Sequence, residues 1–123
     1  MKFYKCSHCG NIIVYVENKG VPVMCCGQKM EEIIPGSVDA AAEKHVPAIF
    51  VSDDKVTVKV GEVPHPMLPE HHIAWVALET ESGYQLKRLD PSGEPEAQFS
   101  VADEKIIAAY EYCNLHGLWK AEY

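Results

Sequence analysis

Hydrophobic and polar residues alternate at residues 55–60, which is the pattern of a half-buried β-strand. Val56, Val58 and Val60, for example, are separated by single polar residues. Successive side chains of a strand point to opposite faces, so this period places the valines against a core. Together with similar short runs that lie between turn residues, this pattern predicts seven strands, at residues 48–51, 55–60, 73–81, 84–89, 96–101, 106–112 and 118–122.

Turn-forming residues separate these predicted strands at regular intervals. Asp53-Asp54, Ser82-Gly83 and Pro91-Ser92-Gly93 are combinations that favour tight turns. Short strands at such spacing are typical of an antiparallel β-sandwich of the immunoglobulin-like type. The sequence therefore predicts an all-β fold for residues 37–123.

The first 36 residues have a different character and are predicted to form a separate small module. They contain a short β segment at 11–16, a turn at 18–20 and a Pro35-Gly36 turn that is suited to a linker. A unit of fewer than about 40 residues usually needs a metal or disulfides to stay folded. Two cysteine pairs offer that support, Cys6 with Cys9 and Cys25 with Cys26.

The second cysteine pair is unusual because its two members are adjacent. Neighbouring side chains on an extended backbone point in opposite directions, so both sulfurs reach one ion only if the chain bends sharply. Four thiolates suit zinc as a structural ion. Iron is the alternative that the rest of the sequence favours.

The bulk composition limits the possible functions. Apolar residues make up 47% of the chain, which is enough for a core, and the formal net charge of −7 argues against a nucleic-acid binder. The first residues lack the apolar core of a signal peptide, and no run approaches the roughly 18 apolar residues of a membrane span. We therefore expect a cytoplasmic protein with no membrane partner, in which the five cysteines bind metal rather than form disulfides.

Histidines gather around a second group of candidate ligands. Cys113 and His116 lie three residues apart at the end of an apolar, aromatic run, and His65 and His71 share a loop that contains three prolines. Prolines stiffen such a loop and exclude regular structure from it. His71 and His72 are adjacent, and we choose His71 as the ligand because only one of the two can face inward.

Residues 37–47 precede these groups and contain three consecutive alanines, which suit a single helical turn. The segment is too short for a stable isolated helix, and we interpret it as a loop that delivers Glu43, Lys44 and His45. Imidazoles and a thiolate around one ion suit iron, zinc or copper. Five protein ligands would leave one octahedral position open, which a reactive metal needs.

Taken together, these motifs closely resemble desulfoferrodoxin, the two-iron form of superoxide reductase. The resemblance covers nearly the whole chain. It rests on five segments, at residues 6–10, 25–27, 43–47, 64–67 and 112–117.

The resemblance implies the ligands and the fold. The first iron of the family matches Cys6, Cys9, Cys25 and Cys26. Its catalytic iron, held by four imidazoles and an axial thiolate, matches His45, His65, His71, His116 and Cys113. The implied fold is a small rubredoxin-like, desulforedoxin-like module followed by an immunoglobulin-like sandwich.

The resemblance also implies a reaction, the one-electron reduction of superoxide to hydrogen peroxide. Lys44 would attract the anion, and Glu43 would close the open position after turnover. A rubredoxin-like electron donor and a homodimer are expected. Two other functions are consistent with the residues alone, a zinc-stapled binding module and a non-catalytic electron carrier.

Overall fold

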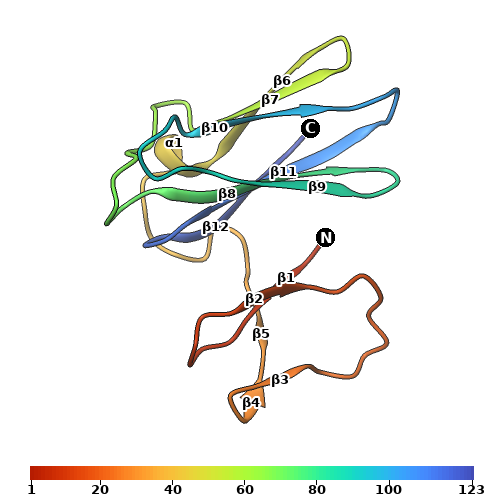
Figure 1. The fold of residues 1–123 in the computed structure, drawn as a ribbon, viewed down its shortest axis with the longest axis vertical. Helices are drawn as coiled ribbons and strands as arrows, with labels where there is room; N and C mark the ends of the chain where they lie inside the picture. The colour runs from red at the N-terminus through yellow and green to blue at the C-terminus, as the bar shows by residue number, and fades with distance from the viewer. The chain divides into compact units, whose positions relative to one another are not determined.

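The computed structural model describes all 123 residues, and the chain folds into two compact units, Met1–Ile34 and Pro35–Tyr123 (Figure 1). Almost all regular structure is β, and the single helix is one turn long. The prediction of an all-β fold is confirmed. No helix of the chain is both long enough and apolar enough to cross a membrane.

The first unit contains five very short strands. A three-stranded antiparallel sheet places β1 (Phe3–Lys5) between β2 (Ile12–Val14) and β5 (Glu31–Glu32), and a hairpin joins β3 (Met24–Cys25) to β4 (Gln28–Lys29). Its buried apolar side chains are few, namely Phe3, Cys6 and Met30. The strand expected at 11–16 is shorter than predicted. The other four strands were not predicted, because two or three residues are too few to show a period.

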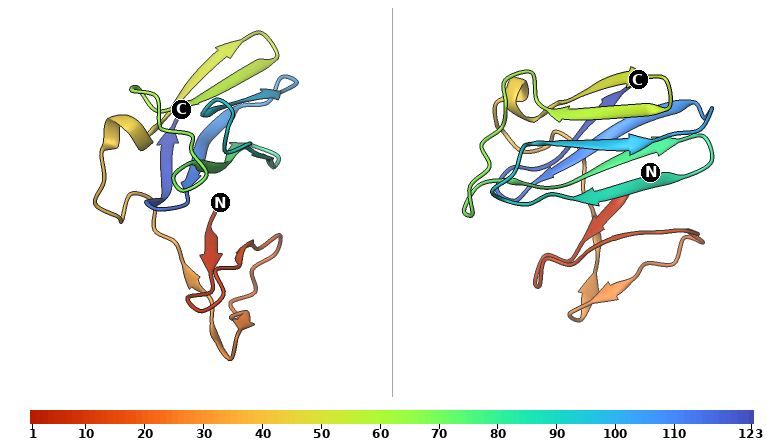
Figure 2. Two further views of the ribbon diagram at one scale, coloured as in Figure 1. Left: turned by 60° about the vertical axis from the view of Figure 1, so that its left-hand side comes forward. Right: turned by 45° about the horizontal axis from the view of Figure 1, so that its top comes forward.

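The second unit is built from two antiparallel sheets. The first has the order β10 (Glu96–Ser100), β7 (Lys55–Val60), β6 (Pro47–Ser52). The second has the order β12 (Gly117–Glu122), β11 (Ile106–Cys113), β8 (Ile73–Thr80), β9 (Tyr84–Arg88). Figure 2 shows the β6–β7 hairpin on one side of this unit and strands β8, β9 and β11 on the other. All seven strands predicted here are present.

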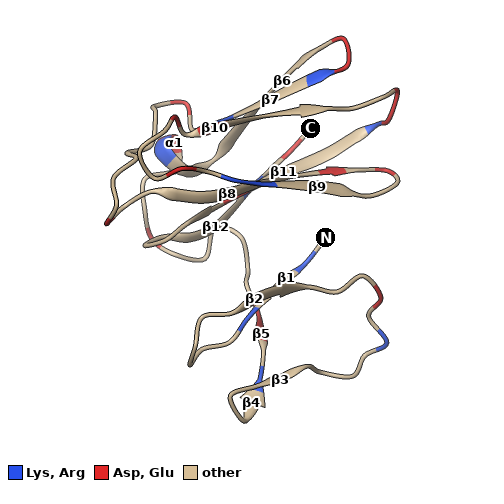
Figure 3. Ribbon diagram, in the orientation of Figure 1, with Lys and Arg blue, Asp and Glu red and all other residues tan.

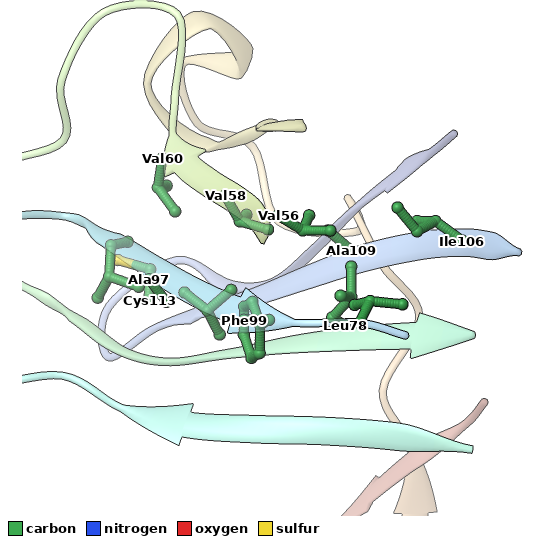
Figure 4. Packing of buried hydrophobic residues seen from close by; sticks show 12 residues of the cluster. Val56, Val58, Val60, Leu78, Ala97, Phe99, Ile106, Ala109 and Cys113 are labelled. Atoms are coloured by element: carbon green, nitrogen blue, oxygen red, sulfur yellow. The ribbon is translucent and has the colours of Figure 1, made fainter. Parts of the chain in front are cut away.

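The core of the second unit lies between its two sheets. Val56, Val58 and Phe99 from one sheet pack with Val76 and Leu78 from the other, and each is at most 1% exposed (Figure 4). The valine period seen in the sequence is therefore the inward face of β7. Burial of aliphatic and aromatic side chains is the main driving force for folding of such a sandwich.

The segments that contain the residues predicted to bind metal in the second unit lie together at one end of the sandwich. The helical turn α1 (Ala42–His45), the loop 61–72 and the β11–β12 turn all lie there, at the left in Figure 1. The segment 37–47 is thus not wholly a loop. Of its three alanines only Ala42 belongs to the helical turn, which the Val46 N–H closes by donating to the Ala42 carbonyl at 2.9 Å.

Candidate metal centres

Five predicted ligands converge at this end of the second unit. His45 ends α1, His65 and His71 lie in the loop 61–72, Cys113 ends β11, and His116 follows in the next turn. One nitrogen or sulfur atom from each lies within 4.8 Å of all the others. Because the five come from three separate segments, only the tertiary fold creates this group. We call it the histidine-rich group.

The four imidazoles of this group form a closed ring. Around it, His45, His65, His71 and His116 follow one another, each packed edge-to-face against its two neighbours. The ring centroids of neighbours are 4.6 to 5.0 Å apart, and the interplanar angles run from 76° to 84°. This arrangement brings one nitrogen of each ring towards a shared centre, as ligation of one ion requires.

The backbone fixes which nitrogen of two rings carries the proton. The Nδ1–H of His45 donates to the Ala41 carbonyl at 2.7 Å, and the Nδ1–H of His65 donates to the Pro66 carbonyl at 2.7 Å. In the neutral rings both Nε2 atoms are then lone-pair acceptors, and they lie only 3.1 Å apart. Two facing lone pairs repel one another unless a proton or a metal ion lies between them. The donor set therefore fits a bound cation.

Burial favours the neutral, ligating form of the same histidines. Burial lowers the pKa of His45 and His71, and it lowers the pKa of His65 to about 4. The Nε2 atom of His71 is buried and has no hydrogen-bond partner. An orphaned buried acceptor costs free energy, and a metal ion would satisfy it.

Cys113 supplies the sulfur of the group and is fully buried. Its Sγ lies 3.5 Å from Nε2 of His65 and 3.8 Å from Nδ1 of His116. Burial raises the pKa of the Cys113 thiol, whereas the backbone N–H groups of Leu115 and His116 lower it by hydrogen bonding to the sulfur. The chain thus offers three ε nitrogens, one δ nitrogen and a sulfur that has its own N–H donors.

Three neighbours of the group were not recognised as functional from the sequence. Trp119 stacks on His45 with 5.0 Å between centroids, and its Nε1–H donates to the His116 carbonyl at 3.1 Å. Glu111 is fully buried, neither carboxylate oxygen has a partner, and burial raises its pKa to about 9. Gly61 packs directly against the backbone of residues 43–45. None of the three carries a local sequence signal.

Glu43 and Lys44 lie on α1 beside the histidine-rich group, and both are exposed. The Glu43 carbonyl accepts the Val63 N–H at 2.8 Å, which ties α1 to the loop 61–72. The positive charge of Lys44 is a minor cause of the lowered pKa of both His45 and His71, and burial is the main one. Figure 3 shows both the blue of a lysine and the red of a glutamate on the turn α1.

The first unit holds the second predicted group, which we call the four-cysteine group. The sulfur atoms of Cys6, Cys9, Cys25 and Cys26 all lie within 4.8 Å of one another. The sharp bend that adjacent cysteines require is the turn of the β3–β4 hairpin, where Cys26 and Gly27 have φ angles of 53° and 76°. Positive φ at both central residues is the geometry of a type I′ hairpin turn.

Backbone and amide N–H groups point at these sulfurs. The Cys9 N–H donates to the Cys6 sulfur at 3.5 Å, the Asn11 N–H to the Cys9 sulfur at 3.4 Å, and the Asn11 side chain to the Cys25 sulfur at 3.8 Å. The hydrogen bond from the Cys9 N–H is the main cause that lowers the pKa of Cys6 to about 6. Such donors stabilise thiolate ligands.

Two other histidines lie outside both groups. His72 turns its Nδ1 to the Leu68 carbonyl, which accepts a hydrogen bond at 2.9 Å, and His8 is exposed in the turn between Cys6 and Cys9. Of the adjacent pair, His71 is the one that enters the histidine-rich group.

Comparisons with known proteins place the chain among well-defined relatives. The family described as desulfoferrodoxin matches residues 37–122. The chain is 46% identical to the desulfoferrodoxin of Desulfarculus baarsii, over 99% of this chain and 96% of that protein. It is 44% identical to the desulfoferrodoxin of Nitratidesulfovibrio vulgaris, over 98% of this chain and 95% of that protein. The crystal structure of the superoxide reductase from Treponema pallidum superposes with a TM-score of 0.83 at 42% identity, covering 98% of each chain.

Proposed function

The chain belongs to the desulfoferrodoxin family, and we propose that it is a superoxide reductase. One superoxide anion takes up one electron and two protons and leaves as one hydrogen peroxide. The similarity to the superoxide reductase of Treponema pallidum supports this reaction class. The observation in the chain itself that supports it most is the pair of buried imidazole Nε2 atoms 3.1 Å apart in a ring of four histidines.

The four-cysteine and histidine-rich groups are those expected of the two iron sites of a desulfoferrodoxin. We propose that His45, His65, His71, His116 and Cys113 hold the reactive iron. When bound there in its ferrous form, iron supplies the electron that superoxide takes up. The four neutral rings add no charge of their own, so the single Cys113 thiolate is the only anionic ligand of the group.

The second iron is proposed to bind Cys6, Cys9, Cys25 and Cys26. On this proposal residues 1–36 form the thiolate-iron domain, and residues 37–123 form the catalytic domain. Following the family resemblance, we further propose that a small redox protein such as rubredoxin supplies electrons and that the protein works as a homodimer. Sedimentation velocity with the purified protein tests the last point.

Lys44 is proposed to attract superoxide. The protein as a whole has a net charge of −7, which repels an anion. At physiological salt the Debye length is about 8 Å, so the nearest charges dominate the approach. Lys44 is exposed and directly precedes His45 on α1, so its ammonium places a positive charge on the segment that presents that histidine.

Glu43 is proposed to close the site after turnover. Its backbone is held to Val63, whereas its side chain is exposed and carries a carboxylate, a ligand that hard ferric iron accepts. The carboxylate would occupy the open side of the site once peroxide leaves and swing away again on reduction. A structure of the oxidised protein in which this carboxylate stays far from the metal under all conditions would contradict this role.

The stoichiometry of the reaction tests the proposed function. Protein reduced beforehand is mixed with a limiting amount of superoxide, and the peroxide and oxygen formed are measured together with the iron content. A reductase yields one peroxide per superoxide and no oxygen, and the proposal expects two irons per chain. Zinc in place of iron would support a binding module, and iron without peroxide formation would support an electron carrier. Either result would contradict the proposal.

The steering role of Lys44 has its own test. Lys44→Ala is expected to slow the second-order reaction with superoxide about tenfold at low salt. It is also expected to weaken the dependence of this rate on salt concentration. Pulse radiolysis across a range of ionic strength measures both effects. Lys55→Ala is the matched control, because it removes the same charge from an exposed position at the start of β7. Equal rates for Lys44→Ala and the control would remove the steering role.

A further inference from the structure

His71 lies on a segment that has little regular support of its own. The loop 61–72 carries prolines at positions 64, 66 and 69. Near its end, the only backbone pairing within the loop is between Leu68 and His71, whose N–H and carbonyl groups exchange hydrogen bonds at 2.9 and 3.1 Å. His71 is also only half-buried, unlike His45 and His65. Its ring position must therefore be fixed by something outside the loop.

Asn114 provides three hydrogen bonds to this stretch. Its side-chain Oδ1 accepts the His72 N–H at 2.8 Å, and its Nδ2–H donates to the Glu70 carbonyl at 3.0 Å. Its own backbone N–H donates to the His72 carbonyl at 3.2 Å. The partners are the residues immediately before and after His71, so a single amide side chain spans the backbone on both sides of that histidine.

The position of Asn114 in the chain makes this contact more than a loop anchor. Asn114 directly follows Cys113 and comes two residues before His116. We propose that Asn114 is a positioning residue, which fixes the His71 ring relative to the Cys113 sulfur and the His116 ring. An amide is suited to this task because it offers a donor and an acceptor at the same time. The proposal depends on the ligand assignment made above.

The proposal is tested by the release of iron from the reduced, fully loaded protein to a ferrous chelator. Residues that orient metal ligands typically change metal affinity by about 10- to 100-fold when they are replaced. Asn114→Ala is expected to speed loss of iron from the histidine-rich group by a factor in this range, while the four-cysteine iron is released at the wild-type rate. Asn18→Ala is the matched control, because it removes an amide that accepts one backbone N–H, that of Gly20, at 2.9 Å in the first unit.

Asn114→Asp separates positioning from a general loss of structure. An aspartate keeps the acceptor for the His72 N–H but has no donor for the Glu70 carbonyl. Hydrogen exchange of the His72 amide is expected to stay slow in Asn114→Asp and to become at least about tenfold faster in Asn114→Ala. Asn114→Asp should also release iron more slowly than Asn114→Ala. Wild-type iron release and wild-type His72 protection in Asn114→Ala would overturn the proposal.

His71→Ala distinguishes failure of this inference from failure of the proposed ligand set. If His71→Ala speeds iron release and Asn114→Ala does not, His71 is a ligand and Asn114 does not position it. If His71→Ala leaves iron release unchanged, His71 is not a ligand and the assignment itself is wrong. Circular dichroism of each variant shows whether the sandwich is folded, and an Asn114→Ala variant that unfolds leaves Asn114→Asp to decide.

Discussion

At the scale of single residues, Gly61 is the position where a small change should have the largest effect. A Cβ atom there would lie 2.7 Å from the Glu43 carbonyl oxygen, 2.8 Å from the Lys44 carbonyl carbon and 3.1 Å from the His45 nitrogen. These are backbone atoms, which cannot turn aside as a flexible side chain can. The glycine therefore allows the loop 61–72 to pack against the segment that presents the side chains of Glu43, Lys44 and His45.

We predict that Gly61→Ala displaces α1 and impairs the site. Overpacking of this kind typically costs about 1–3 kcal/mol of stability. The rate of superoxide consumption and the iron content should fall together, because Glu43, Lys44 and His45 move with the same backbone. Stopped-flow kinetics, metal analysis and thermal unfolding measure the three effects.

Gly83→Ala is the control for this prediction. Gly83 lies in the β8–β9 turn, where an added methyl group would have no atom within 4 Å, and its φ angle is not in the left-handed region. The same chemical change there should leave rate and iron content at wild-type values. A Gly61→Ala protein with wild-type kinetics would contradict the prediction, because the site would then work despite the added methyl group beside residues 43–45.

At the scale of secondary-structure elements, the sequence predicted the sandwich much better than the small module. β7 alternates between buried and more exposed residues and was predicted with its observed ends, and the other six strands of the second unit were predicted as strand-length runs bounded by turn residues. Strands of two residues such as β3 and β4 contain no period at all. Their positions follow from a turn and from a shared group of sulfur atoms, and neither is visible in a hydrophobic pattern.

The candidate site shows the same division. Ligand types were predictable because thiolates and imidazoles are chemically conspicuous and because the motifs resemble a known family. The supporting residues Gly61, Glu111, Asn114 and Trp119 were not predicted in their roles. Gly61, Asn114 and Trp119 act through contacts with segments far away in the chain, such as Asn114 with residue 70 and Trp119 with His45. Those contacts exist only in the folded chain.

The β3–β4 turn is the element on which the four-cysteine group depends most. Gly27 follows the two adjacent cysteines with a φ angle of 76°, which side chains other than glycine rarely adopt. We predict that Gly27→Val weakens iron binding at the four-cysteine group and leaves the histidine-rich group loaded. Visible absorption of the thiolate-bound iron, with total iron content, measures the difference.

Gly20→Val is a suitable comparison for the turn. Gly20 also has a positive φ, 81°, and nothing lies within 4 Å of an added methyl group, but it is five residues away from Cys25. Both variants carry a similar backbone strain in the same unit. Equal loss of thiolate-bound iron in the two would mean that general destabilisation, rather than the β3–β4 turn, is responsible.

At the scale of the whole molecule, the two units differ in what holds them together. The second unit has a continuous core between two sheets, to which strands β7, β8, β10 and β11 contribute. The first unit buries only three apolar side chains, and one of them is Cys6 of the four-cysteine group. A unit this small gains too little from apolar burial to offset the conformational entropy of its chain. Its folding should therefore depend on metal, whereas folding of the second unit should not.

We predict that removal of metal unfolds residues 1–34 and leaves the sandwich intact. Binding of metal to a site that exists only in the folded state contributes directly to the free energy of folding, so removing the ion from the four-cysteine group removes the main support of the first unit. Amide hydrogen exchange after chelation should become fast from β1 to β5, while β8 and β11 stay protected. His65→Ala, which disturbs only the histidine-rich group, should leave β1 to β5 protected. Slow exchange in β1 to β5 of the metal-free protein would contradict the prediction, because the small core of Phe3 and Met30 would then keep the first unit folded without metal. Fast exchange in β8 as well would show that folding of the sandwich also depends on its metal.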